Sequence, residues 1–403
     1  MRWSPFCAAL AAGALLLAGC GGNPPGDASR IDAKLVSNLA PGDAQAVAQS
    51  VNAFGFDLFK QVADGNENTI TSPLSVATLL AMVLAGADGG TATKMAGVLH
   101  LSESRDVRVG ALLRSLSDTD EVKLSVADAL WAGKDTPIED DYLSYVRHTL
   151  GATVEQGDLG SPETARAIDK WAKTTTNGKI DKIAGDLGLP DPQAVLVLLN
   201  AVYFLGEWKT EFEDTRPGSF AVPGAGGVDV PTMHLTHANL EMAQLDGYRM
   251  LRLPYGKKGR YGMEILLPDE GNSLGGVLGK LDADSWQQAI GRLAPAELDE
   301  VTLPSFELRW SGDLTDPLKR MGVPATGFTA MSKLDPALTR VVHKTYVRVD
   351  EKGTEAAAVT GGVMATAARA GTLDFRVDRP FAFAVSDRQT GAVLFLGAVT
   401  DPR

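Results

Sequence analysis

The chain has 403 residues, of which 44% are hydrophobic and 22% are charged. These proportions are ordinary for a soluble globular protein, and the length suffices for one large domain or a few average ones. The formal net charge of −12 argues against nucleic acid as a partner, because phosphate backbones bind surfaces rich in Lys and Arg. No segment repeats at a period of about 20 to 50 residues, which excludes a solenoid.

The first residues have the pattern of an export signal. A short apolar run, too short to span a bilayer, is followed by the sequence LAGC, which ends at Cys20. This sequence resembles the bacterial lipobox, which implies cleavage before Cys20 and a diacylglycerol on its thiol. The alternative is a plain signal peptide that leaves Cys20 free. We therefore predict a signal over 1–19, a lipidated Cys20 with a flexible tether over 20–42, and a folded domain over 43–403. The protein is expected to be exported, and either lipid-anchored to the cell envelope or extracellular.

The elements predicted after residue 43 are mostly helices at first and mostly strands later. Ser72 followed by Pro73 marks a helix start, because Ser accepts hydrogen bonds from the free N–H groups there and Pro lacks one. The predicted helices cover 43–62, 73 to the glycines after Ala85, 140–150, 161–178, 274–293 and 313–321. The predicted strands cover 122–133, 193–205, 228–235, 248–256, 261–268, 301–310, 339–351, 373–377, 380–387 and 391–399. Helices followed by strands indicate the α+β class rather than alternating βαβ units. Because no Pro- and Gly-rich boundary interrupts 40–403, one large domain is favoured over two.

The sequence shows no catalytic or metal-binding set. Nothing matches the common nucleophile, phosphate-loop or zinc motifs. His234 and His237 lie in a strand-like segment, where residues three apart face opposite sides, so they are not expected to share a metal. With Cys7 lost in the signal and Cys20 lipidated, a disulfide, a thiol active site and a Cys-ligated zinc are excluded. We therefore predict no enzyme activity, no metal and no cofactor.

One stretch near the C-terminus, EKGTEAAAVTGGVMATAARAG over 351–371, consists mainly of the small residues Ala, Gly and Thr. Such a run is usually a flexible linker. This one lies between two predicted strands of one domain, where a long structureless loop is uncommon unless it has a function.

Five further stretches carry a family resemblance, in the order NTITSPLSVATLLAMVLAGADGGTATKMAGVLHL, IDKWAKTTTNGKIDKI, VLLNAVYFLGEWKTEF, VHKTYVRVDEKGTEAAA and DRPFAFAVSDRQTGAVLFLGAVTDP. Together they resemble the serpin family over nearly the whole chain, from about Ala48 to Pro402. The resemblance implies a single α+β domain with roughly nine helices, about three β-sheets and an exposed reactive-centre loop over about 351–374.

The resemblance also implies suicide inhibition of serine or cysteine proteases by a monomer. The target protease cuts the loop and forms a covalent acyl-enzyme. The freed strand then inserts into the central sheet, and serpins are a known case of such strand addition. The target protease is thus the expected partner, together with a membrane through the lipid on Cys20.

The family hinge matches Glu351, Gly353, Thr354, Glu355, Ala356, Ala357 and Ala358. If Thr354 is the first inserting residue, alternate side chains point inward. This inward set is Thr354, Ala356, Ala358, Thr360, Gly362 and Met364. None is charged and the first five are small, which suits insertion, because burying a charge costs several kcal/mol.

Two other family clusters carry over by motif. Ser72, Ser75, Asn200 and His343 match the shutter, a polar cluster beneath the central sheet in which a buried His bonds to Asn and Ser. Trp208 and Glu351 match the breach, where insertion starts. Many serpins pair that Glu with a Lys that follows Leu-Pro on a neighbouring strand, but here Ser305 follows Leu-Pro, so this ion pair is predicted to be absent.

The bond that the protease cuts is predicted by counting seventeen residues from Glu351, which places it between Ala367 and Ala368. Small residues there suit elastase-like or subtilisin-like proteases. The alternative is the bond between Arg369 and Ala370, which suits a trypsin-like protease. A further alternative is a non-inhibitory serpin that acts as a surface binding or structural protein.

Overall fold

The computed structural model describes residues 42–117, 119–354 and 373–403. The predicted signal, Cys20, and hinge residues Glu355, Ala356, Ala357 and Ala358 lie outside these ranges. The two candidate scissile bonds, Ala367–Ala368 and Arg369–Ala370, also lie outside them.

Nine helices form within the described ranges, and local signals set the ends of several. Ser72 accepts a hydrogen bond from the Ser75 N–H at the start of α3, with Pro73 as its first residue, as predicted. The predicted helix over 274–293 is two helices, because Asp282 and Ser285 form a capping box that starts a second one. The helices are α2 (Asp43–Val62), α3 (Pro73–Ala85), α4 (Gly89–Val98), α5 (Val107–Ser117), α6 (Asp140–His148), α7 (Pro162–Thr175), α8 (Leu274–Lys280), α9 (Ala283–Arg292) and α10 (Thr315–Arg320).

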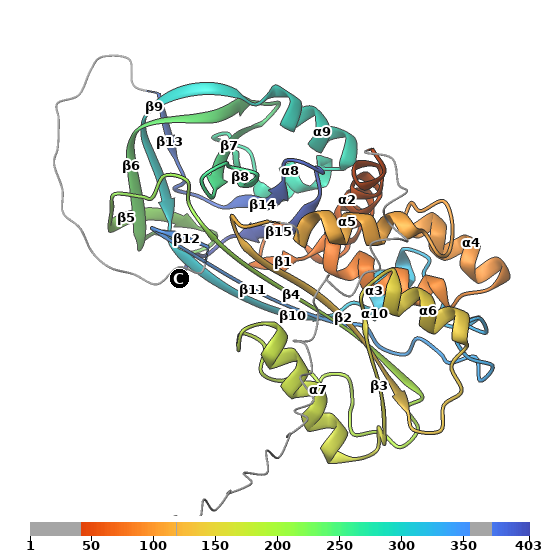
Figure 1. Cartoon of the computed structure of the whole chain (residues 1–403). Helices are drawn as coiled ribbons and strands as arrows, with labels where there is room; N and C mark the ends of the chain where they lie inside the picture. The colour runs from red at the N-terminus through yellow and green to blue at the C-terminus, as the bar shows by residue number, and fades with distance from the viewer. Residues whose placement is uncertain (1–41, 118, 355–372) are drawn as a thin grey trace, which may run out of the picture.

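A six-stranded sheet runs diagonally through the molecule (Figure 1), in the order β10-β11-β12-β4-β2-β3. Its strands are β10 (Phe306–Asp313), β11 (Val342–Asp350), β12 (Gly353–Thr354), β4 (Leu196–Glu207), β2 (Lys123–Gly133) and β3 (Thr153–Gly157). The two residues of β12 therefore lie between the long strands β11 and β4, which places the start of the small-residue stretch inside the sheet.

A nine-stranded sheet lies above it in Figure 1, in the order β1-β15-β14-β8-β7-β6-β9-β13, with β5 paired to β6. Its strands are β1 (Thr69–Thr71), β5 (Asp214–Val222), β6 (Gly226–Gln244), β7 (Tyr248–Tyr255), β8 (Tyr261–Pro268), β9 (Ala294–Pro304), β13 (Asp374–Arg376), β14 (Phe381–Asp387) and β15 (Val393–Val399). The α+β class is confirmed. Where the resemblance implies three sheets, the described ladders join into two, because the 19-residue β6 pairs with β5, β9 and β7 along its length.

One predicted strand, 301–310, is divided between the two sheets. Residues up to Pro304 belong to β9 in the nine-stranded sheet, and residues from Phe306 belong to β10 in the six-stranded one. The chain changes sheets at Ser305, whose N–H still donates to the carbonyl of Pro231 on β6, one position beyond the last β6–β9 pair, Thr232 and Pro304.

The core lies between the two sheets and is organised around α3, whose 13 residues are all buried. Alternate side chains of β4 face opposite sides. Val202 and Phe204 join the cluster that contains α3, whereas Leu199 and Ala201 pack with α7 on the outer face. Figure 1 shows α7 on one side of this sheet and the other early helices on the opposite side.

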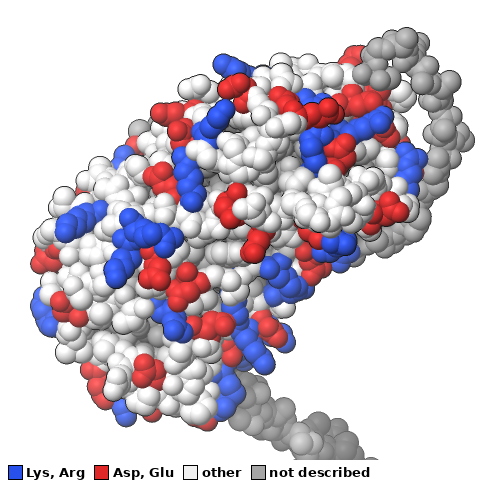
Figure 2. All heavy atoms as spheres, turned by 180° about the vertical axis from the view of Figure 1, so that it is seen from behind, with Lys and Arg blue, Asp and Glu red and all other residues white. Residues whose placement is uncertain are grey.

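The molecular surface is mixed in charge. Seen from behind, Lys and Arg alternate with Asp and Glu over the described residues (Figure 2). Within the described part of the chain, no helix is both long enough and apolar enough to cross a bilayer.

Candidate functional site

The start of the small-residue stretch is held inside the six-stranded sheet. Thr354 pairs antiparallel with Val349 of β11 on one side and with Gly206 of β4 on the other. Gly353 approaches β4 so closely that a Cβ there would clash with the carbonyl oxygen of Gly206. Backbone proximity therefore requires glycine at position 353.

The side chain of Thr354 points inward. It is 1% exposed, and its hydroxyl hydrogen-bonds to the hydroxyl of Tyr255. Burial raises the pKa of Tyr255 well above its ordinary value, so this phenol stays protonated. A charged side chain at this position would therefore be forced into the core.

The breach residues clamp the turn that leads into β12. Trp208 donates from its indole Nε1 to the carbonyl of Asp350 at 2.9 Å and from its N–H to the carbonyl of Lys352 at 2.7 Å. Its ring stacks on Tyr255 with centroids 4.4 Å apart. The Glu351 carboxylate accepts from the Thr215 hydroxyl, so among the described residues its side chain contacts a hydroxyl rather than a cation.

Beyond Thr354, the facing edges of β4 and β11 lie side by side without a ladder in the described part of the chain. Strand β4 pairs with β2 and β12, and β11 pairs with β10 and β12. We call the space between these two edges the seam. It begins at β12 and continues along both strands toward Leu196 at the start of β4.

The four shutter residues meet where the start of α3 contacts both sides of the seam. The N–H of Ser72 donates to Nε2 of His343 on β11 at 3.0 Å. The hydroxyl of Ser75 donates to Oδ1 of Asn200 on β4. Burial lowers the pKa of His343 to about 4, which keeps the ring neutral and able to accept. No hydrogen bond joins His343 to Asn200 among the described residues; α3 connects them instead.

Sequence reasoning missed one member of this cluster, Asp128 on β2. Nδ2 of Asn200 donates to Oδ1 of Asp128 at 2.7 Å and to the hydroxyl of Thr78 at 3.0 Å. Asp128 is 2% exposed, and its Oδ2 has no hydrogen-bond partner among the described residues. Burial raises its pKa to about 7. The sequence carried no signal for its burial, because β2 also contains Lys123 and Ser125, and a carboxylate in a strand is normally exposed.

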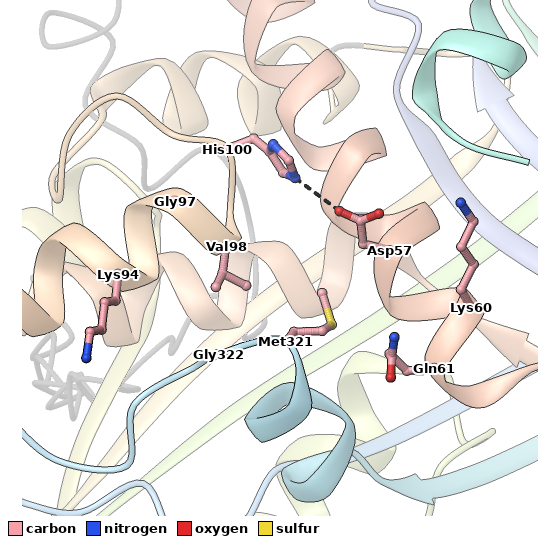
Figure 3. A pocket seen from close by; sticks show the side chains of 9 residues that line it. All are labelled: Asp57, Lys60, Gln61, Lys94, Gly97, Val98, His100, Met321 and Gly322. Atoms are coloured by element: carbon pink, nitrogen blue, oxygen red, sulfur yellow. Dashed lines mark hydrogen bonds and ion pairs between the residues drawn. The ribbon is translucent and has the colours of Figure 1, made fainter.

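Away from the seam, the structure shows a surface hollow and the two histidines singled out in the sequence. A hollow of about 690 Å³ lies between α2 and α4 (Figure 3), where Asp57 and His100 face each other at 3.2 Å and are both about half exposed. His234 contacts Glu300 at 3.1 Å, whereas His237 is exposed. Within the described ranges, no group of three His, Cys, Asp or Glu could hold a metal.

Comparison with known proteins agrees with this geometry. Residues 49–402 match the family model described as Serpin (serine protease inhibitor). An uncharacterized serpin-like protein of Thermococcus kodakarensis is 36% identical over 382 residues, which cover 91% of this chain and 88% of that protein. The leukocyte elastase inhibitor of Sus scrofa is 32% identical over 375 residues, which cover 87% of this chain and 97% of that protein.

The structural comparison gives the same family. The crystal structure of the thermophilic serpin tengpin in its native state superimposes with a TM-score of 0.78 at 26% identity, covering 88% of this chain and 94% of that one. Serpins bind target proteases, are generally secreted or extracellular, and act as inhibitors rather than as catalysts. The chain therefore belongs to the serpin family of protease inhibitors and is not an enzyme.

Proposed function

We propose that this protein is a suicide-substrate inhibitor of serine or cysteine endopeptidases. The protease cuts the bond between Ala367 and Ala368, becomes acylated by Ala367, and is trapped when the segment after Thr354 inserts into the seam. The acyl step forms an ester or thioester to the protease nucleophile and releases the new amino group of Ala368. Elastase-like and subtilisin-like proteases are the proposed targets, because their primary pockets accept small side chains.

The observation that carries the proposal is the position of Thr354. It occupies the top of the seam with its side chain inward, and the facing strands beyond it have no ladder in the described residues. An inserting strand would complete on the order of ten ladder hydrogen bonds, each worth about 1 kcal/mol net. This gain is comparable to the whole stability of a domain, and is large enough to hold a trapped complex.

The proposed target class has further support. The leukocyte elastase inhibitor of Sus scrofa is named for an elastase and is 32% identical to this chain. Small residues on both sides of the proposed bond agree with that class of protease.

A protease panel tests the proposal and its alternatives. The mature chain is incubated with elastase-, subtilisin-, trypsin- and papain-like enzymes, and the released C-terminal peptide is sequenced. We expect a peptide that begins at Ala368 and rapid loss of elastase-like or subtilisin-like activity. A peptide that begins at Ala370, with inhibition of the trypsin-like enzyme, would move the site to Arg369. Cleavage without inhibition of any enzyme would indicate a non-inhibitory serpin.

We also propose that the chain is exported, cleaved before Cys20 and lipidated on that thiol. The folded domain over 43–403 then hangs from a membrane by the tether over 20–42. Expression in a bacterial host with a labelled fatty acid should give a labelled, membrane-associated protein. A Cys20→Ala variant should lose both the label and the membrane association, and equal labelling of the two proteins would contradict the anchor.

A further inference from the structure

A cavity of about 340 Å³ lies at the end of β4 and β11 that is farthest from β12. Leu196 and Leu198 at the start of β4 line one side, and residues 338–341 before β11 line the other. Its floor is apolar and comes from α3 and from the segment before β11, through the side chains of Leu79, Leu80, Val83, Phe328 and Met331. None of the shutter or breach residues lines the cavity, so it is separate from both clusters.

The start of β4 directs free backbone groups toward this cavity. The N–H of Gly133 donates to the carbonyl of Val195 at 2.9 Å, so the backbone of Val195 faces β2. Successive residues of an antiparallel strand direct their N–H and C=O groups to alternate sides. Leu196 and Leu198 therefore direct theirs away from β2, where the described ladders give them no partner. The cavity thus has hydrogen-bond donors and acceptors beside an apolar floor.

The size and the lining of the cavity suit a small aromatic ligand. Its volume equals that of about eleven water molecules at roughly 30 Å³ each, which leaves room for about ten non-hydrogen atoms. Ligand pockets of proteins begin near this volume, at about 300 Å³. The ring of Phe328 and the thioether of Met331 both make favourable contacts with an aromatic ring.

The charged groups at the rim already have partners. Nη1 of Arg340 donates to the carbonyl of Asp186 at 2.8 Å, and its Nε lies 3.8 Å from the carboxylate of Asp313. Oδ1 of Asp191 accepts from the N–H of Gln193 at 2.9 Å. Because Arg340 and Asp191 carry opposite charges, the rim favours an ion of neither sign. An ionic ligand would also bury its charge against the apolar floor, which is costly.

We propose that this cavity is a binding site for a small, neutral aromatic molecule that carries one amide group. The ring lies on the apolar floor, and the amide donates to a carbonyl and accepts from an N–H of Leu196 or Leu198. Benzamide has this chemistry and about this size. The inference goes beyond the proposed function, because it concerns the intact chain and needs no protease.

Methyl NMR of the intact mature chain tests the site, with benzamide as the probe. The methyl signal of Met331 is identified by its loss in Met331→Leu. We expect this signal to shift as benzamide saturates the site with a Kd of about 1 mM, in keeping with so small a ligand. Benzoate has the same ring but a charge, and should bind about tenfold more weakly or less. No shift with benzamide, or equal affinity for benzamide and benzoate, would overturn the proposal.

A matched pair of variants tests whether binding occurs in this cavity. Ala337 is exposed and lines the cavity, whereas Ala325 is exposed in the same loop and does not line it. Ala337→Phe should fill the mouth and weaken benzamide binding about tenfold, while the melting temperature without benzamide stays the same. Ala325→Phe should bind benzamide like the wild type. Equal affinity of the two variants would place benzamide elsewhere and overturn the site.

Melting temperatures give a second readout on the same proteins. Because a ligand that binds only the folded state stabilises it, benzamide should raise the melting temperature of the wild type and of Ala325→Phe. The rise should be smaller for Ala337→Phe, and an equal rise in all three proteins would contradict the site. The protease panel is run without benzamide, so failure of this inference leaves the proposed function standing, and failure of the panel leaves the cavity standing.

Discussion

At the scale of single residues, Thr354 is the position from which the proposed insertion starts. Its side chain is already buried against Tyr255, so any replacement must fit the core before and after cleavage. Thr354→Arg should convert the inhibitor into a substrate, because burying an unpaired guanidinium costs several kcal/mol. The loop should still be cut, but an SDS-stable protease adduct should no longer form.

The matched control for this change is Glu355→Arg, which places the same charge at the next position with the opposite phase. Glu355→Arg should inhibit nearly as well as the wild type. Adduct formation by Thr354→Arg at the wild-type stoichiometry would show that Thr354 does not face inward during insertion.

The shutter contains two buried titratable residues whose effects on stability oppose each other. Burial lowers the pKa of His343 to about 4 from 6.5, so its contribution to the free energy of unfolding is present above pH 6.5 and is lost as the pH falls toward 4. Burial raises the pKa of Asp128 to about 7 from 3.8, so its contribution is present below pH 3.8 and is lost as the pH rises through 7. Between about pH 4 and 6.5 the free energy of unfolding rises with pH through His343 by about as much as it falls through Asp128, so the two contributions cancel.

Single substitutions should expose each slope. For Asp128→Asn, the free energy of unfolding, measured relative to the wild type, should rise between pH 4.5 and 7, by a few kcal/mol at most. For His343→Gln it should fall over the same range. Urea unfolding at several pH values measures both, and the wild type serves as the reference for all other titrating groups. Parallel pH profiles for the two variants would contradict the assignment.

At the scale of elements, the contact between β12 and β4 depends on the absence of a side chain at position 353. Gly353→Ala should push the two strands apart, because its Cβ would clash with the backbone of Gly206. The intact chain should lose about 2 kcal/mol of stability, a size typical of a strained backbone contact. Thermal melting of the intact chain measures this loss.

Gly185→Ala is the control, because a Cβ at that position meets nothing within 4 Å. It should melt within a degree or two of the wild type. Equal melting temperatures for Gly353→Ala and Gly185→Ala would mean that β12 is not held between its neighbours in solution.

The elements that the sequence predicted well are those with local signals. Ser72 and Pro73 mark the start of α3 without help from the rest of the fold, because a helix cap involves only neighbouring residues. The division of 301–310 at Ser305 could not be predicted this way, since the partner of the Ser305 N–H is the carbonyl of Pro231, far away in sequence. The two-residue β12 likewise exists only because β11 and β4 flank it.

In the candidate site, too, the sequence predicted some features, and others depend on the tertiary fold. The family motifs identified Ser72, Ser75, Asn200 and His343, and the structure brings these four residues together. Their connection through the start of α3, rather than through a bond between His343 and Asn200, depends on how the helix meets the sheet. Asp128 was missed because an acidic residue in a strand is normally solvent-facing, and only the tertiary fold shows that it is buried.

At the scale of the whole molecule, the six-stranded sheet has a strand position between β11 and β4 that is only partly occupied in the described residues. Strands β11 and β4 carry two residues of β12 between them and then continue without a ladder among the described residues. In the proposed mechanism the sheet gains stability by accepting more of the same segment, and cleavage of the peptide bond frees that segment to insert. The intact molecule is therefore expected to be the less stable of two states, with cleavage as the trigger.

The central claim is that the free energy released when the cut segment inserts into the sheet traps a protease. The most direct measurement is the intact mass, under denaturing conditions, of the mature chain after mixing with an elastase-like serine protease. We predict one covalent species whose mass is that of the protease plus the chain through Ala367, together with a free peptide from Ala368 to Arg403. Complete cleavage of the loop with only free protease and free cleaved chain in the spectrum would contradict the claim.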